Sequence, residues 1–250
     1  MSLRSAKKPL YKPAVAGFIL IVLAVIITIA GPLGSRTGVW DFDAAVIIIT
    51  WAAYVALGAL VLCLPGLWFA RPGGKKRGLI YSLSGLLIVI PMIIFLQTWK
   101  SAKENFPPIQ DITTNTEEPL SFWYAPNSRV YGGEAVARLQ REAYPYIKPL
   151  YLSASPERAY DLVVQIIREK GWKLYPSSKE DMHIEATETT FWFGFSDDVT
   201  IHITATDNGG SKIEMRSASR FGSGGDAGTN ARRIRSFFDA LKKQTENNKE

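Results

Sequence analysis

The sequence has little of the side-chain chemistry on which metal and redox sites depend. Its 250 residues include one cysteine, Cys63, and two histidines, His183 and His202. A single cysteine cannot form a disulfide within the chain, and its position inside an apolar run argues against a reactive thiol. Two histidines without cysteine partners argue against a zinc site. We therefore expect no metal and no other cofactor.

Acidic residues are nearly absent from the first part of the chain. Residues 1–103 hold 11 Lys and Arg against Asp41 and Asp43, a net charge of +9, whereas residues 104–250 hold 18 against 21, a net charge of −3. Basic charge beside long apolar runs is typical of membrane orientation, and a mildly acidic polar half disfavours phosphate binding. We expect a two-part membrane protein that does not bind nucleic acid.

Three apolar runs contain no Asp, Glu, Lys, Arg or His: residues 13–34, 44–70 and 78–99. Each has the roughly 20 residues that a helix needs to cross a hydrocarbon core of about 30 Å. We therefore predict an anchor of three transmembrane helices within residues 1–103. A cleaved signal peptide is the alternative for the first run, against which its length argues.

Positive charge flanks these runs asymmetrically. Four Lys or Arg precede the first run, four lie between the second and the third, and Arg36 alone lies between the first and the second. Cytoplasmic loops are enriched in Lys and Arg. We therefore predict a multi-pass protein of the bacterial inner membrane, with a cytoplasmic N-terminus and with residues 104–250 in the periplasm.

The interior of the apolar runs lacks the ionisable groups that mark ion and proton pathways, which argues against a transporter or channel. Ala52, Ala56 and Ala59 form a stripe of small residues on one side of the second run. Such a stripe suits close helix packing within the anchor, and the alternative is docking of another membrane subunit.

Proline is frequent in residues 104–150 and forbids long regular elements there. We predict an extended arm with one short helix at residues 133–142. The arm is also rich in apolar side chains, so we expect it to wrap around a core formed by residues 151–250. The apolar residues expected to be buried are Ile109, Ile112, Leu120, Phe122, Trp123, Tyr124, Tyr144, Tyr146 and Ile147.

The core has clear periodic patterns. Ser155 and Pro156 are typical of a helix start, and apolar residues then recur at helical spacing as far as Gly171. Strand patterns follow at residues 172–175, 183–189, 199–206 and 212–220, and a last helix is predicted at 227–243. The fold class is therefore α+β, an antiparallel sheet with helices packed on one face. The other face is polar, and we expect His202 on it to be solvated.

Several segments are similar to a known family. They are the arm FPPIQDITTNTEEPLSF, then YPYIKPL, then GWKLYPSSKEDMHIEATETTFWFGFSDDVTIHI, and the tail RSASRFGSGGDAGTNARRIRSFFDAL. Over about residues 104–242 the chain resembles the domain-of-unknown-function 1499 family. The resemblance implies a secreted, lipoprotein-like or membrane-tethered module, and it implies no activity.

Four charged residues of the sheet are candidates for chemistry. Asp197 and Asp198 precede one predicted strand, and Arg216 and Arg220 share one face of the next. Paired carboxylates serve in acid-base catalysis or bind cations. Because no third catalytic partner stands out, structural ion pairs are the favoured interpretation.

The last helix carries one polar residue on its apolar stripe. Asn230 lies four residues before Ile234, whereas Arg232, Arg233 and Arg235 fall away from the stripe. A buried amide needs hydrogen-bond partners. We predict that Asn230 pins the SASR strand or the glycine-rich loop before the helix, and a ligand contact is the alternative.

The glycine-rich loop, residues 222–228, leads into this helix. Asp226 is predicted to cap the helix. Binding of an anion at the helix start is the alternative, and a negative residue there would compete with it.

Four aromatic residues gather between two predicted strands: Phe191, Trp192, Phe193 and Phe195. They cannot all enter one small core. Three alternatives follow: the aromatic side chains line a hydrophobic pocket, they lie exposed near the bilayer, or the arm covers them.

No catalytic constellation is visible, and the G-x-S-x-G motif of a serine hydrolase is absent. We therefore favour a non-enzymatic accessory or scaffold subunit that contacts other membrane proteins. The alternative is a module that binds a lipid or isoprenoid. A cavity lined by Phe191, Trp192 and Phe195 would favour the alternative, and a filled core with an exposed patch would favour the accessory subunit.

Overall fold

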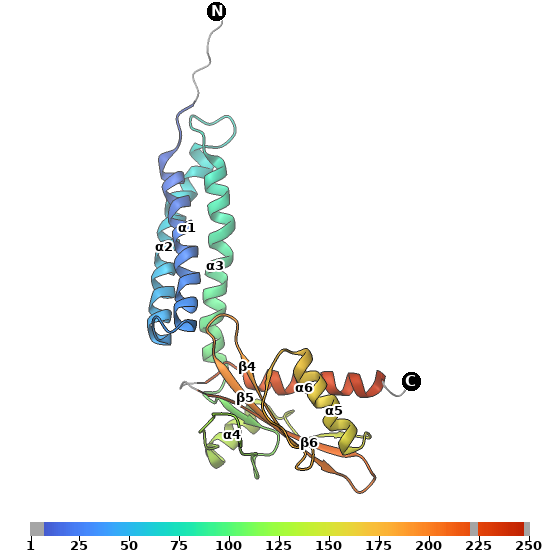
Figure 1. The fold of residues 1–250 in the computed structure, drawn as a ribbon. Coiled ribbons are helices and arrows are strands. Elements are labelled where there is room, and N and C mark those ends of the chain that lie inside the picture. Colours follow the sequence, from blue (N-terminus) through green and yellow to red (C-terminus); the bar gives the residue numbers. More distant parts are fainter. Residues whose placement is uncertain (1–7, 221–224, 248–250) are drawn as a thin grey trace, which may run out of the picture. The chain divides into compact units, whose positions relative to one another are not determined.

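The computed structural model describes residues 8–220 and 225–247. The chain divides into two compact units, Met1–Ser101 and Ala102–Glu250. The described residues form six helices and six strands, and all of the strands belong to the second unit (Figure 1).

The first unit is built from long apolar helices: α1 (Lys12–Arg36), α2 (Phe42–Phe69) and the greater part of α3 (Leu79–Asn105). Both α1 and α2 are long and apolar enough to cross a membrane, whereas the described part of α3 offers a shorter apolar stretch, Leu79–Ile94. Two of the three predicted spans therefore meet the length and composition criterion.

The small-residue stripe lies between helices of this unit. Ala52, Ala56 and Ala59 are fully buried. A Cβ atom at Gly17 of α1 would lie 3.0 Å from the carbonyl oxygen of Ala59 and 2.7 Å from the Sγ atom of Cys63. Only a residue without a side chain permits this approach. The stripe therefore serves packing within the unit.

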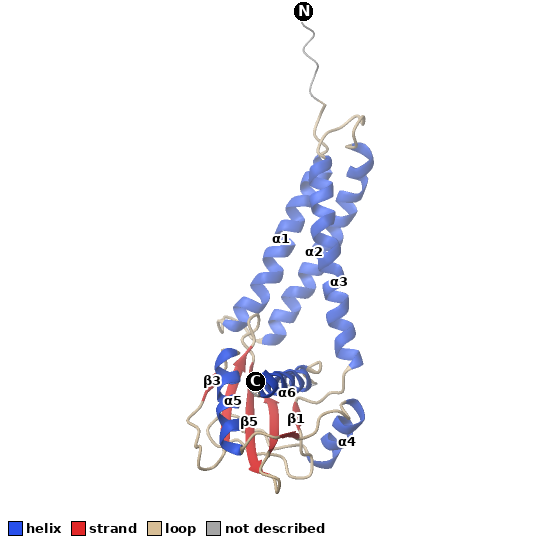
Figure 2. Cartoon of the chain, turned by 90° about the vertical axis from the view of Figure 1, so that its right-hand side faces the viewer, coloured by secondary structure: helices blue, strands red, loops and turns tan. Residues whose placement is uncertain are grey.

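The second unit contains one antiparallel sheet with the order β1-β6-β5-β4-β3 (Figure 2). A further strand, β2, also pairs with β6, so β1 and β2 pair with different segments of that strand. The strands are β1 (Asp111–Thr113), β2 (Leu150–Leu152), β3 (Lys173–Leu174), β4 (His183–Thr189), β5 (Ser196–Ala205) and β6 (Ser211–Ser219).

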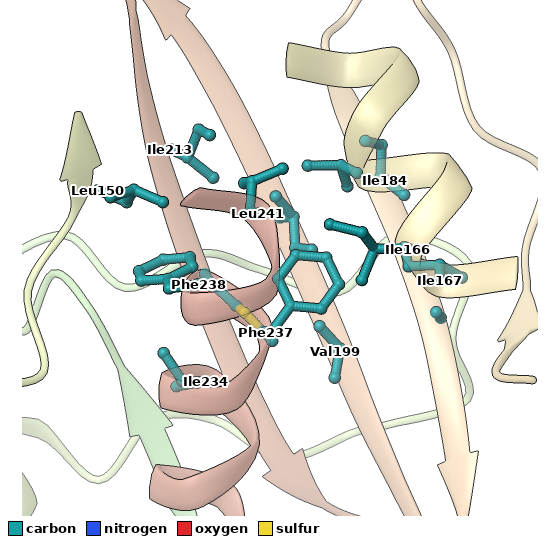
Figure 3. Close-up of a cluster of buried hydrophobic side chains, with 14 of the residues drawn as sticks. Leu150, Ile166, Ile167, Ile184, Val199, Ile213, Ile234, Phe237, Phe238 and Leu241 are labelled. Carbon is teal, nitrogen blue, oxygen red and sulfur yellow. The ribbon is translucent and has the colours of Figure 1, made fainter. Parts of the chain in front are cut away.

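Two helices, α5 (Pro156–Glu169) and α6 (Thr229–Asn247), pack on one face of this sheet, as predicted for an α+β fold. The side chain of Ser155 accepts a hydrogen bond from the amide of Arg158 and caps α5. Figure 3 shows Phe237 of α6 among apolar side chains of α5 and the sheet. A third helix, α4 (Gly133–Ala143), interrupts the arm.

In the second unit, two predicted element starts differ from the observed ones by two residues or more. Strand β5 begins at Ser196, three residues before the predicted start, because Ser196 and Asp197 pair in register with β4. Helix α6 begins at Thr229 rather than at residue 227, since Ala227 has a left-handed backbone, with φ of 52°.

The polar face of the sheet is covered rather than solvated. Glu185 and Thr200 are almost completely buried, and His202 is partly buried. The arm lies over this face and contacts it through hydrogen bonds, as described below. His202 is therefore less solvated than predicted, and its partial burial lowers the pKa of its imidazole.

The arm also turns part of its apolar surface outward. Ile109, Ile112, Tyr144 and Ile147 are buried, as predicted. The prediction was wrong for three other residues, each of which is about half exposed. The three exposed residues are Trp123, Tyr124 and Tyr146.

Candidate functional site

The covered face of the sheet is a layer of polar and charged side chains. Strand alternation directs Glu185 of β4, Thr200 of β5 and Arg216 of β6 away from α5 and α6. The register places these three residues side by side across the strands. Each is at least 97% buried, counting whole residues, so their polar groups need partners within the protein.

The carboxylate of Glu185 binds the backbone of the arm. It accepts hydrogen bonds from the amides of Trp123, Tyr124 (2.9 Å) and Ala125 (2.6 Å), and from the ring of His183 (2.8 Å). Burial alone would raise the pKa of Glu185, but these hydrogen bonds outweigh burial and hold the pKa below its ordinary value. The ionised carboxylate therefore fastens three consecutive residues of the arm.

An aromatic side chain closes the layer above His183. The ring of Trp123 stacks on the imidazole, with centroids 3.8 Å apart and planes 10° from parallel. The Nε2 atom of His183 also lies 3.4 Å from the hydroxyl of Thr200. The imidazole is thus held between the arm and the sheet.

Arg216 joins the sheet to three other points of the arm. Its guanidinium forms two hydrogen bonds with the carboxylate of Asp111, at 2.9 and 2.7 Å. It also donates to the carbonyls of Leu120 (2.5 Å) and Arg129 (3.0 Å), and it lies 4.9 Å from the ring centroid of Phe122. A buried guanidinium with this many acceptors fixes the path of the arm.

The prediction of ion pairs is confirmed for Asp198 and Arg220. Asp198 and Arg220 form a two-point ion pair, at 2.6 and 3.0 Å, and Asp198 is completely buried. The pair raises the pKa of Arg220. Arg216 pairs with Asp111 instead, and Asp197 points to the opposite face of the sheet, because neighbouring residues of a strand alternate.

On the helix side, Asp197 pairs with Arg233 of α6 at 2.6 Å. Arg233 also contacts Glu188 and the hydroxyl of Ser217. It is 5% exposed, so the prediction that it faces away from the buried stripe was wrong. Arg233 follows Asn230 by three residues, about one helical turn, and this spacing already indicated that both residues lie on the same side of the helix.

Asn230 has the structural role that was predicted. It is completely buried. Its side-chain carbonyl accepts from Ser217 (2.6 Å), and its amide donates to Ser219 (3.0 Å) and to the carbonyl of Gln110 (3.0 Å). It therefore ties α6 to the SASR strand and to the beginning of the arm.

Asp226 caps α6, as predicted. Its carboxylate accepts from the amides of Gly228 (2.8 Å) and Asn230 (2.6 Å). Burial raises its pKa. The carboxylate therefore occupies the position in which an anion would bind. Residues 222–224 of the glycine-rich loop lie outside the described residues.

The aromatic residues between β4 and β5 lie at the surface. Phe191 is 76% exposed and Trp192 is 57% exposed, so of the three alternatives, coverage by the arm does not hold for these two residues. Phe193 and Phe195 stack on each other, with centroids 5.3 Å apart. A shallow depression elsewhere on the domain is lined by residues of α5 and the segment after it, and none of the four aromatic residues lines it.

Within residues 8–220 and 225–247, no group of three or more His, Cys, Asp or Glu side chains is placed to hold a metal ion. The family described as "Protein of unknown function (DUF1499)" matches residues 111–241. The match runs from β1 into α6 and so includes the charged layer, the arm and the aromatic loop. No curated protein matches the chain.

Proposed function

The chain belongs to the DUF1499 family, and from that premise we propose that it is a membrane-anchored accessory subunit whose second unit contacts other membrane proteins and catalyses no reaction. The observation that carries this proposal is the arm. Its backbone is fastened to a buried charged layer, while about half of the surface of Trp123 and of Tyr124 stays exposed.

The charged layer is occupied by structural contacts. Glu185 accepts from three backbone amides, Arg216 binds Asp111 and two carbonyls, and Asp198 binds Arg220. An acid or base in catalysis needs an accessible atom that exchanges a proton with substrate. Glu185 and Arg216 hold the arm instead, and Asp198 is tied up within the sheet, which supports a binding role over an enzymatic one.

The outer surface of the arm has the character of a contact surface. Trp123 is 55% exposed, Tyr124 is 48% exposed and Val130 is 87% exposed. Trp and Tyr are enriched among the residues that dominate interface energies, and a surface that is rigid before binding loses less entropy on association. The arm is therefore a preorganised surface for a protein partner.

The proposal includes the topology expected from the charge pattern. The N-terminus is cytoplasmic, α3 is a third membrane span, and the second unit is in the periplasm of the bacterial inner membrane. Support comes from the Lys and Arg that flank the apolar helices, and from two helices, α1 and α2, that are long and apolar enough to cross a membrane.

An internal lipid or isoprenoid site is the competing function, and it requires a cavity lined by the aromatic loop. The side chains of Phe191 and Trp192 face solvent, and the core between the sheet and α5 and α6 is filled by apolar side chains (Figure 3). This arrangement favours the contact module.

The proposal is tested by extracting the full chain from its native membrane into nanodiscs and recording native mass spectra. We expect a co-purifying polypeptide at fixed stoichiometry that is lost with Tyr124→Ala. Tyr151→Ala is the matched control, because Tyr151 is also exposed but lies on β2, and the partner should stay bound. A retained small molecule without any polypeptide would contradict the proposal.

A further inference from the structure

We propose that the loop between β4 and β5, residues 190–195, places its aromatic side chains in the interfacial layer of the bilayer. This inference rests on the membrane anchoring proposed above and is independent of the protein contacts. The loop carries Phe191, Trp192, Phe193 and Phe195, and residues 189–196 contain no charged side chain. Aromatic residues, Trp above all, favour the boundary between headgroups and hydrocarbon.

The loop has a defined backbone shape that leaves Phe191, Trp192 and Phe195 exposed. The amide of Thr190 donates to the carbonyl of Phe195 at 2.8 Å, and the amide of Phe195 donates to the hydroxyl of Thr190 at 2.9 Å. Gly194 has φ of 68°, a left-handed conformation that lets its amide donate back to Thr190. The exposed aromatic surface is thus built by the backbone.

The position of the loop within the second unit points to the bilayer as its partner. One row of paired residues crosses the sheet through Thr187, Asp198, Ala218 and Asp111. The loop follows β4 just beyond this row, and the arm arrives from α3 at Asp111 in the same row. The loop therefore projects from the end of the sheet at which the chain comes from its anchor.

The connection to the anchor is short. Residues 106–110 alone separate the last residue of α3 from β1. Five residues extend at most about 18 Å. The opposite end of the sheet carries the turn after Ala205, which lies seven residues, or about 24 Å, along β5 from the row of Asp111 and Asp198. The chain therefore enters the sheet, at Asp111, near the end that carries the aromatic loop.

The carboxylates next to the loop are all ion-paired. Glu188 and Asp197, which flank it, both pair with Arg233, and Asp198 pairs with Arg220. Unpaired carboxylates here would be repelled by anionic headgroups. All three carboxylates are thus held in ion pairs, and the two guanidinium groups reduce their combined charge to −1 beside the aromatic surface.

The test uses fluorescent labels on single cysteines in the full chain, with Cys63→Ala as background. The protein is placed in nanodiscs of phosphatidylcholine and phosphatidylglycerol that contain lipids with a quenching doxyl group at a shallow or a deep acyl position. The loop is labelled at Phe191→Cys, and at Trp192→Cys as a second site should the first variant not fold. Asp207→Cys labels the opposite end of the sheet, and Leu57→Cys labels the exposed side of α2.

We expect lipid quenching of the loop label, strongest with the shallow doxyl position, and no quenching at position 207. Adding Trp192→Ser to the Phe191→Cys protein should cause most of the quenching to be lost. If the label at position 57 is quenched while the loop label behaves like the label at 207, the anchoring stands and this inference is overturned. If the label at 57 is not quenched either, the proposed anchoring fails with it.

Discussion

The ring of Trp123 lies on the imidazole of His183, with centroids 3.8 Å apart and planes 10° from parallel. Trp123 belongs to the arm and His183 to β4, so the stack joins an irregular segment to the sheet. The next residues of the arm bind Glu185 through their amides. The arm is therefore an integral layer of the domain.

Removal of this stack should loosen the arm. Trp123→Ala is expected to lose about 1 kcal/mol of ring contact, which corresponds to a roughly five-fold larger open population. Limited proteolysis within residues 120–131 should become faster by a similar factor. Trp123→Phe keeps an aromatic ring over His183 and should be cut at nearly the wild-type rate. Equal rates for wild type and Trp123→Ala would contradict this role of the ring.

Replacement of the buried carboxylate should destabilise the domain. Glu185→Gln retains one acceptor oxygen but turns an amide donor toward backbone amides that are also donors. We expect a loss of about 2 kcal/mol in the free energy of unfolding. Urea unfolding followed by tryptophan fluorescence measures it, and Glu180→Gln at an exposed site should change little.

The same carboxylate should make stability depend on pH. The pKa of Glu185 is lowered from its ordinary value of 4.5 in the folded protein. Its stabilisation is therefore fully present above pH 4.5 and is lost as the pH falls through the folded pKa. As the pH falls below 4.5, the free energy of unfolding should decrease more for the wild type than for Glu185→Gln. Parallel curves for the two proteins would show that the carboxylate is not held in this way.

The ion pair of Arg216 and Asp111 should show strong coupling in a double-mutant cycle. Both side chains are buried, and either one left alone would be a buried charge without its partner. We expect a coupling energy of about 2 kcal/mol with Arg216→Met and Asp111→Asn. The exposed pair of Lys179 and Asp161 is the control, and its coupling should stay below about 0.5 kcal/mol. Similar coupling in both cycles would argue against a structural role for Arg216.

Truncation of the Asn230 side chain should destabilise the domain. Asn230→Ala leaves Ser217, Ser219 and the carbonyl of Gln110 without their shared partner. We expect a loss of about 2 kcal/mol in the free energy of unfolding, measured by thermal or urea unfolding. Asn208→Ala, in the exposed turn after β5, should stay near the wild type. A wild-type midpoint for Asn230→Ala would contradict the pinning role.

Local signals in the sequence predicted much of the fold. Ser155 and Pro156 predicted the start of α5, and apolar alternation predicted β4 with the bounds His183 and Thr189. The apolar stripe around Ile234 predicted the burial of Asn230. Each of these signals lies within the same helix or strand as the residues that it predicts, so no knowledge of the rest of the fold is needed.

The charged layer was harder to predict because its contacts are distant in sequence. Asp111 and Arg216 are 105 residues apart, and no local pattern links them. Alternation could have separated Asp197 from Asp198, since neighbouring strand residues face opposite sides. The outward turn of Trp123 had no such signal, because it follows from the hydrogen bonds of its own amide with Glu185.

The arm is held closed over the charged sheet face. Amide hydrogen exchange at Trp123, Tyr124 and Ala125 tests it most directly, in the full chain and in Glu185→Ala. We predict slow exchange at all three amides in the wild type and fast exchange in the variant, because Glu185 is their acceptor. Exchange in the wild type at the rate of an unstructured segment would contradict the claim and leave Glu185 and His183 open for chemistry.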